Sequence, residues 1–249
     1  MASLRGLLAL ALLAFLLTLV ARLPARWLPP LLPQGVVCIE PSGTLWRGAC
    51  ANLEAGGLRL GLVRWSLRPL PLLTGRAAAS LRIAQPLATL EGELTLSVGG
   101  RIEGRDWHGN LILGAGGLLP AVPPDLEGRV ALALDRWTLQ ERAVRQLLGH
   151  IEIQELRRRA AAGAMPLGSY ELSFADELDA AGNVVGRLED RGGPLEVAGR
   201  LALTAAPGYL LEGTVAPRPS ASPELVRQIA FLGTPDAAGR RPFAQEATF

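Results

Sequence analysis

The sequence predicts a mostly β protein: an extended antiparallel sheet of repeated hairpins, built as a curved sheet or an open sandwich, with one or two short helices. A single N-terminal transmembrane helix is predicted in front of this sheet. Three observations lead to this fold class. Glycine and proline occur 29 and 19 times in 249 residues, which implies frequent chain reversals. Apolar residues alternate with others in several segments, as strands require. One apolar run stands near the N-terminus.

The apolar run covers residues 6–21 and reads GLLALALLAFLLTLVA. A spanning helix needs about 20 residues, and snorkelling of Arg5 and Arg22 would extend the run to residues 4–23. Trp27 stands where interfacial aromatic residues collect. The competing interpretation is a cleaved signal peptide, but the candidate cleavage points lack a small residue at the −3 position. We therefore predict an uncleaved anchor.

Three segments are expected along the chain. Residues 1–23 are predicted to form the transmembrane signal anchor. Residues 24–34 are rich in proline, which disrupts both helices and paired strands, so a stiff spacer is expected there. Residues 35–249 are then the β-rich domain. The arginines on the two sides of the apolar run are too evenly distributed to decide the orientation.

The two cysteines, Cys38 and Cys50, are 12 residues apart. In an oxidising compartment they could form a disulfide across a hairpin and contribute about 2–3 kcal/mol by loop closure. The alternative is two independent buried thiols that behave as small apolar side chains. Both interpretations remain open. A redox pair is not expected, because the two-residue gap of redox motifs is absent.

The domain begins with alternating segments. Residues 36–40 are predicted as a strand, residues 41–43 as a turn and residues 45–53 as the returning strand. A further strand is predicted over residues 58–67. The segment PLPLLTG (69–75) contains too much proline for a strand interior and is predicted to form a turn of helix or a tight crossover.

A weak internal repeat follows, in which a glycine precedes alternating apolar residues. It begins at Gly92, Gly128 and Gly199, with a looser copy at Gly168, and the first three are spaced by 36 and 71 residues. We expect each glycine to reverse the chain at the start of a repeated hairpin.

Two short helices are predicted to interrupt the strands. One covers residues 140–148 and ends at Gly149. The other covers residues 223–232, where Ser222 can cap the first turn and Pro223 suits the first helical position. The acidic segment that follows residue 175 is predicted as a hairpin loop over residues 179–183, because the ligand spacing of a calcium loop is absent.

Composition excludes several classes of function. The 25 basic and 23 acidic residues leave a net charge of +2, which is unlike a dedicated nucleic-acid binder. His108 and His150 are the only histidines, and no nucleophile motif accompanies them. We therefore predict neither an enzyme nor a metal site nor a cofactor. The basic run at residues 157–159 is predicted as a solvated loop, with contact to lipid headgroups or an acidic partner as the alternative.

Four tryptophans lie in or beside predicted strands: Trp46, Trp65, Trp107 and Trp137. Tryptophan supplies a large apolar surface, both in cores and at binding interfaces. Packing within the sheet and contact with a partner both remain open for these residues.

Several motifs resemble, in order and spacing, the N protein family of the bacterial type II secretion system. No motif is specific by itself, and together they cover about residues 35–241. They are SGTLWRG (42–48), WSLRPLPLLTG (65–75), Leu119-Pro120 with LEG (126–128), DRGGPLEVAG (190–199), and Leu232-Gly233 with Asp236 and Gly239-Arg240.

The resemblance implies a single-pass protein of the inner membrane whose bulk lies in the periplasm. It also implies an accessory part of the machinery that exports folded proteins across the outer membrane, with other secretion proteins as partners. No catalytic set carries over. Pro242 departs from the pattern and leaves a C-terminal strand in doubt. The alternative function is a periplasmic protein that binds or bridges lipid in a β-lined groove.

Overall fold

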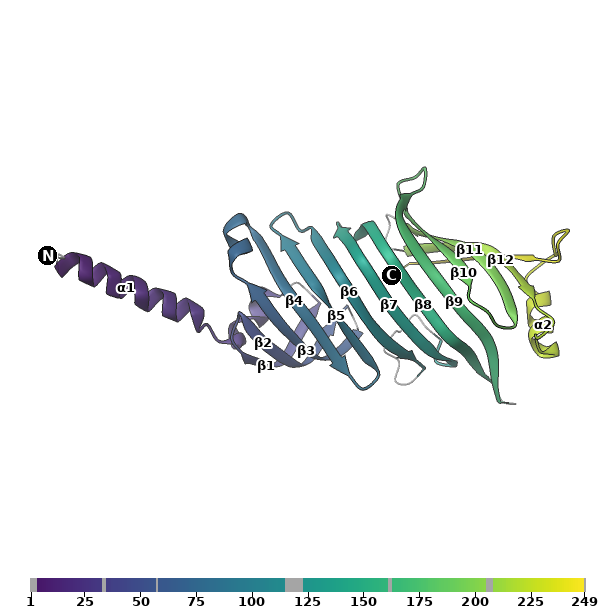
Figure 1. The fold of residues 1–249 in the computed structure, drawn as a ribbon, viewed down its shortest axis with the longest axis horizontal. Helices are drawn as coiled ribbons and strands as arrows, with labels where there is room; N and C mark the ends of the chain where they lie inside the picture. The colour runs from purple at the N-terminus through teal and green to yellow at the C-terminus, as the bar shows by residue number, and fades with distance from the viewer. Residues whose placement is uncertain are drawn as a thin grey trace.

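The computed structural model describes residues 4–32, 35–56, 58–114, 123–160, 163–204 and 208–248. It contains one sheet of 13 antiparallel strands, in which every strand pairs with its neighbours in the sequence (Figure 1). The sheet is open, with β1 and β13 as its edges. The mostly β fold is thus confirmed, and of the two predicted arrangements the protein adopts the single sheet.

The strands have the following bounds: β1 (Val36–Gly43), β2 (Arg47–Ala55), β3 (Leu58–Arg68), β4 (Arg76–Gln85), β5 (Ala88–Ser97), β6 (Ile102–Leu113), β7 (Leu126–Gln140), β8 (Ala143–Ala160), β9 (Gly163–Leu178), β10 (Val184–Asp190), β11 (Leu195–Thr204), β12 (Gly208–Pro217) and β13 (Arg241–Thr248).

Helices occur at the ends of the sheet and in one connection. Helix α1 (Leu4–Ala21) extends from the N-terminal end of the sheet (Figure 1). The 3-10 helices η1 (Ala25–Trp27) and η2 (Pro29–Leu31) follow it, and η3 (Leu70–Thr74) joins β3 to β4. Helix α2 (Pro223–Ala230) packs on β12. Judged by length and hydropathy together, a membrane-crossing helix is not found among the described residues.

The strand register separates an apolar face from a polar face. Residues that pair across antiparallel strands point to the same side of a sheet, and the next residue points to the other side. One row of paired residues defines the apolar face: Val63, Ile83, Leu90, Gly109, Leu132, Ile151, Leu172, Leu188, Gly199, Gly213 and Phe243. The adjacent row defines the polar face: Arg64, Arg82, Glu91, His108, Ala133, His150, Ser173, Arg187, Arg200, Glu212 and Ala244.

Helix α2 covers the apolar face near the C-terminal end of the sheet. Its buried side chains Leu225 and Ile229 join a cluster that includes Val197 and Val215. The Ser222 hydroxyl accepts a hydrogen bond from the Leu225 amide at 3.3 Å, as predicted for the cap. The predicted helix is confirmed, although it ends two residues earlier than expected.

The repeated glycines do not reverse the chain, so this part of the prediction was wrong. Gly92, Gly128 and Gly199 lie inside β5, β7 and β11. A Cβ atom at Gly92 would lie 2.5 Å from the Trp107 ring, and one at Gly199 would lie 2.7 Å from the Glu212 carbonyl oxygen. Glycine is required at these positions because a neighbouring ring or backbone occupies the space of a side chain.

The helix predicted over residues 140–148 is also wrong. The segment forms the end of β7, a two-residue turn at Glu141 and Arg142, and the beginning of β8. Both turn residues have positive φ angles, of 53° and 65°, as tight hairpins require. Apolar residues in this segment, such as Leu147, are buried by neighbouring strands, and pairing therefore overrides local helical propensity.

Other short-range predictions differ from the structure at their boundaries. The first turn falls at residues 44–46, because Pro41 continues β1 and pairs with Cys50. Pro242 likewise lies within β13, opposite Thr214. Both prolines lie on edge strands, where a missing N–H is tolerated. The basic run at residues 157–159 belongs to β8 rather than to a loop.

The remaining predictions about connections have mixed outcomes. The hairpin loop over residues 179–183 is confirmed, with the Asp179 carboxylate accepting hydrogen bonds from the amides of Ala181 and Asn183, each at 2.9 Å. The helical crossover at residues 69–75 is confirmed as η3. The predicted spacer folds as η1 and η2, of which η1 packs on β1 and β2. The Leu119-Pro120 motif and residues 33–34 lie outside the described residues.

Candidate functional site

Three of the four singled-out tryptophans stack on glycines of the apolar face. Trp65 lies over Gly48, Trp107 over Gly92 and Trp137 over Gly104, each on an adjacent strand. The rings of Trp107 and Trp137 lie 6.0 Å apart at 55°. In these positions the indoles fill space that a glycine leaves in the sheet, and they stabilise the pairing of neighbouring strands.

The fourth tryptophan connects α1 to the sheet. The Trp46 indole N–H donates a hydrogen bond of 2.7 Å to the Val20 carbonyl oxygen in the last turn of α1. The Leu45 amide donates to the Leu23 carbonyl at 2.8 Å, and Pro24 forms a bridge with Thr44. The β1–β2 turn therefore holds the C-terminal end of α1 at one end of the strands.

Cys38 and Cys50 form a disulfide between β1 and β2, with a Cα–Cα distance of 5.6 Å. Both residues are buried, with 8% and 1% of their surface exposed. The bond closes the edge hairpin that also holds α1. A disulfide at this position strengthens the end of the sheet that has the fewest neighbours.

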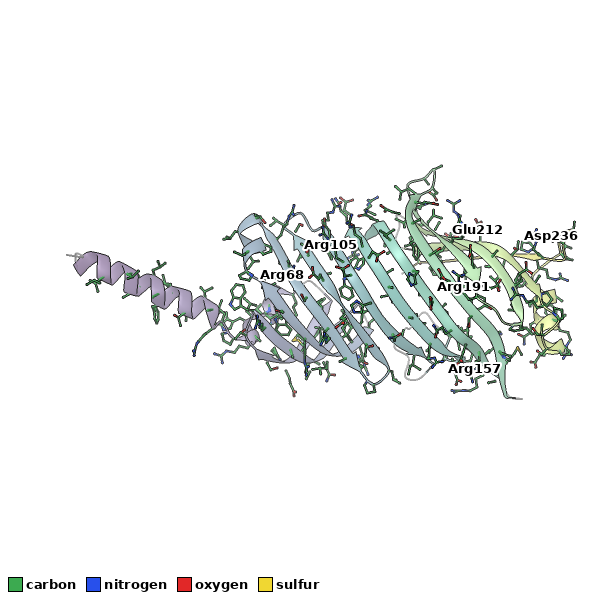
Figure 2. All side chains as sticks on the ribbon, in the orientation of Figure 1. Arg68, Arg105, Arg157, Arg191, Glu212 and Asp236 are labelled. Atoms are coloured by element: carbon green, nitrogen blue, oxygen red, sulfur yellow. A yellow bond between two sulfur atoms is a disulfide. The ribbon has the colours of Figure 1, made fainter. Side chains whose placement is uncertain are left out.

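The polar face carries charged side chains along its length. Figure 2 shows Arg68 and Arg105 toward one end of the sheet, and Arg191 and Glu212 toward the other. Many of the charges pair across strands, and Arg129 on β7 with Glu155 on β8 is one example, at 3.2 Å. Exposed pairs of this kind contribute little stability and keep the face soluble.

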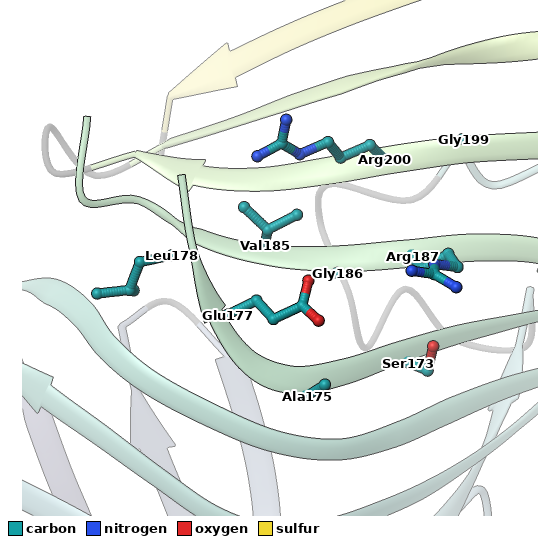
Figure 3. Close-up of a pocket in the computed structure, with 9 residues that line it drawn as sticks. All are labelled: Ser173, Ala175, Glu177, Leu178, Val185, Gly186, Arg187, Gly199 and Arg200. Carbon is teal, nitrogen blue, oxygen red and sulfur yellow. The ribbon is translucent and has the colours of Figure 1, made fainter. Parts of the chain in front are cut away.

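A hollow of about 450 Å³ lies on the polar face over β9, β10 and β11. Figure 3 shows Arg187, Arg200, Glu177 and Ser173 among the residues that line it. Arg187 and Arg200 pair directly across β10 and β11. The hollow could hold an anionic group, but its lining includes neither histidine nor cysteine for nucleophilic or metal chemistry.

His108 forms a charged cluster on the polar face. Its Nε2 atom lies 2.8 Å from Glu91 Oε1, and Arg82 contacts the other Glu91 oxygen at 2.6 Å. The hydrogen bond that His108 donates to Glu91 raises the pKa of His108, and the Asp106 carbonyl oxygen acts in the same direction. The hydrogen bonds from His108 and Arg82 lower the pKa of Glu91. Across the described residues, no three His, Cys, Asp or Glu side chains are grouped to hold a metal ion.

NMR titration of His108 should give a pKa above the ordinary value of about 6.5. Because the raised pKa reflects a favourable contact of the protonated ring, this contact stabilises the fold below pH 6.5 and is lost as the pH rises through the raised pKa. Glu91→Gln should return the pKa of His108 toward 6.5, whereas Glu103→Gln, on the same strand as His108, should leave that pKa raised. An unchanged pKa in Glu91→Gln would contradict the assignment.

A partly buried polar cluster lies at the β10–β11 turn, and the sequence prediction did not single it out. Asp190 Oδ1 accepts a hydrogen bond of 2.7 Å from Arg218, and Oδ2 accepts one of 3.3 Å from the Val197 amide. Burial alone would raise the pKa of Asp190, but the bonds from Arg218, Val197 and Gly192 hold it below its ordinary value. Asp190 is the first residue of the motif DRGGP, and this motif was the feature of the sequence that could have pointed to the cluster.

The tyrosine beside this cluster is buried. Burial and the Asp190 charge raise the pKa of Tyr170 to about 12, and its hydroxyl donates to the Leu167 carbonyl oxygen at 2.6 Å. The phenol therefore stays protonated at neutral pH. Together, Asp190, Arg218 and Tyr170 order the turn next to the cluster beneath α2.

Asp190→Asn should destabilise the protein by about 1.5 kcal/mol at pH 7, since it weakens a charge-assisted hydrogen bond. The native carboxylate has a lowered pKa, so its contribution is present above the unfolded pKa of about 4 and is lost as the pH falls through the folded value. Urea unfolding at pH 7 and pH 3 should thus show a smaller difference between variant and wild type at the lower pH. Asp135→Asn, at an exposed position on β7, is the control. An equal difference at both pH values would contradict this role.

The two edge strands differ from the interior of the sheet. β1 presents Val37 and Ile39, which are 52% and 44% exposed. β13 presents Ala244, Gln245 and Glu246, all exposed. An edge strand offers backbone donors and acceptors to another chain.

Comparisons with known proteins place the chain among secretion proteins. A family model described as "Type II secretion system (T2SS), protein N" matches residues 19–244. The protein named type II secretion system protein N from Aeromonas hydrophila is 31% identical over 243 residues, which cover 94% of each chain. The protein of the same name from Vibrio cholerae serotype O1 is 27% identical over 244 residues, or 92% of each chain. No solved structure matches significantly.

Proposed function

This chain belongs to the type II secretion system protein N family, and from that premise we propose that it is an accessory inner-membrane component that assembles with other secretion proteins. It would act by contact rather than by catalysis, and it would thereby assist the export of folded proteins across the outer membrane. The open sheet carries this proposal. Its edges, β1 and β13, each have a strand on one side only, and such edges bind partner strands by β-augmentation.

Residues 1–23 are proposed as a single-pass anchor, with residues 24–34 as the connection and residues 35–249 in the periplasm. Three features support this. At 1.5 Å per residue, the 18 residues of α1 span about 27 Å, close to the hydrocarbon thickness of about 30 Å. Apolar side chains are exposed around α1, including Leu8 and Phe15 at 63% and 64%. A disulfide between Cys38 and Cys50 suits an oxidising compartment such as the periplasm.

Photo-crosslinking in living cells tests the proposed edge contacts. A photoreactive amino acid at Val37 or Gln245, one on each edge strand, should yield adducts with proteins of the secretion apparatus. The same group at His150, which is exposed at the centre of the polar face, is the matched control. Adducts at position 150 but at neither edge would contradict the proposal.

A second candidate function is the binding of lipid acyl chains along the apolar face. The observation that favours it is the unbroken row of apolar residues and glycines from Val63 on β3 to Leu188 on β10. Among the described residues, α2 packs on β12, η1 on β1 and β2, and η3 on β4. Within this row Val63 and Ile83 are buried, whereas Leu90, Leu132, Ile151, Leu172 and Leu188 are half-buried and leave apolar surface for a ligand.

A photoactivatable phosphatidylglycerol distinguishes this candidate from simple anchoring. If acyl chains occupy the apolar face, adducts should form within β5–β8, and Leu132→Asp should remove them. Ala131→Asp, one residue away on the polar face, should leave them in place. Adducts confined to α1 would rule this candidate out without affecting the proposed edge contacts.

A further inference from the structure

An exposed apolar cluster lies at one end of the strands, outside both faces of the sheet. Leu70 and Leu73 of η3 are 76% and 85% exposed, and Val98 in the β5–β6 connection is 88% exposed. The Val98 amide donates a hydrogen bond of 3.1 Å to the carbonyl oxygen of Gly75, which ends η3. The two connections therefore form one surface. We call Leu70, Leu73 and Val98 the rim patch.

Hydrogen bonds connect the rim patch to the end of α1. Trp46 donates from its indole to Val20 in the last turn of α1, and its carbonyl oxygen accepts a bond of 2.7 Å from the Leu67 amide. Leu67 precedes η3 by only three residues. The rim patch therefore stands at the same end of the strands as the β1–β2 turn, which holds the end of α1.

The connection between α1 and the sheet is short and is bonded to the sheet. Residues 23 and 24 already bond to the β1–β2 turn, and Ala25 in η1 is only 1% exposed. These contacts hold the end of the sheet against the point where α1 ends. Any surface that holds α1 would also face the rim patch.

The same end of the sheet is rich in arginine. Arg22 and Arg26 follow α1, Arg47 begins β2, and Arg76 begins β4. Two further arginines, Arg68 and Arg101, flank the rim patch in the sequence and pair with Glu93 and Glu103. Basic residues around exposed apolar side chains are typical of a surface that binds an anionic bilayer.

We propose that this end of the sheet rests on the bilayer, with the rim patch inserted among the lipid headgroups beside α1. The inference rests on the proposed anchoring by α1 and adds a second attachment that orients the sheet. At this depth the leucine and valine side chains of the rim patch are removed from water, while the arginines contact lipid phosphates. The polar face of the sheet remains in the aqueous phase.

Fluorescence of full-length protein in vesicles tests the proposal. Leu73→Cys and Val98→Cys are labelled separately with an environment-sensitive dye under non-reducing conditions, which keep the Cys38–Cys50 bond intact. The vesicles contain equal parts of phosphatidylcholine and phosphatidylglycerol. Both labels should shift to shorter emission wavelengths and lose intensity when lipids carry a quencher near the headgroup. Phe231→Cys, at an 89% exposed position near the other end of the chain, is the matched control and should show neither change.

The outcomes separate this inference from the proposed function. If the protein does not insert into vesicles, the anchor and the rim contact both fail. If it inserts but both rim labels stay in water, only the rim contact fails. Emission that shifts without quenching by lipid would identify a protein, such as a second copy of this chain, as the occupant and would overturn the bilayer contact.

Discussion

Gly104→Ala should destabilise the protein by about 3 kcal/mol, because a Cβ atom at this position overlaps the ring of Trp137. Gly104 is buried in β6 and pairs directly with Trp137 on β7. The indole cannot move aside easily, since Trp137 packs against a buried cluster that contains Leu147 and Phe174. Urea unfolding, followed by tryptophan fluorescence, measures the change.

The matched control is Gly99→Ala, in the β5–β6 connection, where an added Cβ atom meets no atom within 4 Å. This substitution should change stability by no more than about 0.5 kcal/mol. In a Trp137→Ala background, Gly104→Ala should lose most of its cost, as a double-mutant cycle would show. The same cost in both backgrounds would mean that the ring does not explain the requirement for glycine.

Replacing both cysteines, as Cys38→Ser with Cys50→Ser, should lower the free energy of unfolding by about 3 kcal/mol. The disulfide joins residues 12 apart, and closing a loop of this size in the unfolded chain accounts for most of the effect. Both positions are buried, so the serine hydroxyls add a smaller desolvation cost. Denaturation of the oxidised wild type and of the double variant measures the difference.

Reduction provides the control for this prediction. Dithiothreitol should bring the wild type close to the double variant and should leave the double variant unchanged. Because the β1–β2 hairpin also binds α1 through Trp46 and Leu45, hydrogen exchange should increase first in β1 and in residues 22–27. Equal stability of the oxidised and reduced wild type would contradict a structural role for this bond.

The strand pattern could be predicted where alternation was strong and turn residues were clear. The strand at residues 58–67, the loop at residues 179–183 and the helix after Ser222 all follow from local rules. Residues 140–148 could not be resolved in this way, since their apolar residues fit a helix and a hairpin equally well. Pairing with neighbouring strands decides between them, and those neighbours are distant in the sequence.

The candidate sites show the same contrast between what local sequence predicts and what depends on distant neighbours. The sequence singled out Cys38, Cys50 and the tryptophans by residue type alone. It could not show that Trp46 binds the end of α1, or that Trp137 covers Gly104, because both contacts depend on strand register. The rim patch was missed for a related reason. Leu70, Leu73 and Val98 are ordinary apolar residues until the fold leaves them exposed at one end of the strands.

By itself, the sequence determined that the protein is mostly β, that an apolar segment precedes this domain, and that the family resemblance points to type II secretion. Composition and period suffice for the first two conclusions because they reflect local backbone preferences, whereas the third rests on the resemblance of the motifs to those of the family. Only the tertiary structure decided that 13 strands form one open sheet, that its repeated glycines make room for rings and backbone, and that three apolar side chains are exposed together at one end of it. These properties depend on which strands pair and in which register, and register follows from the summed packing of the whole sheet.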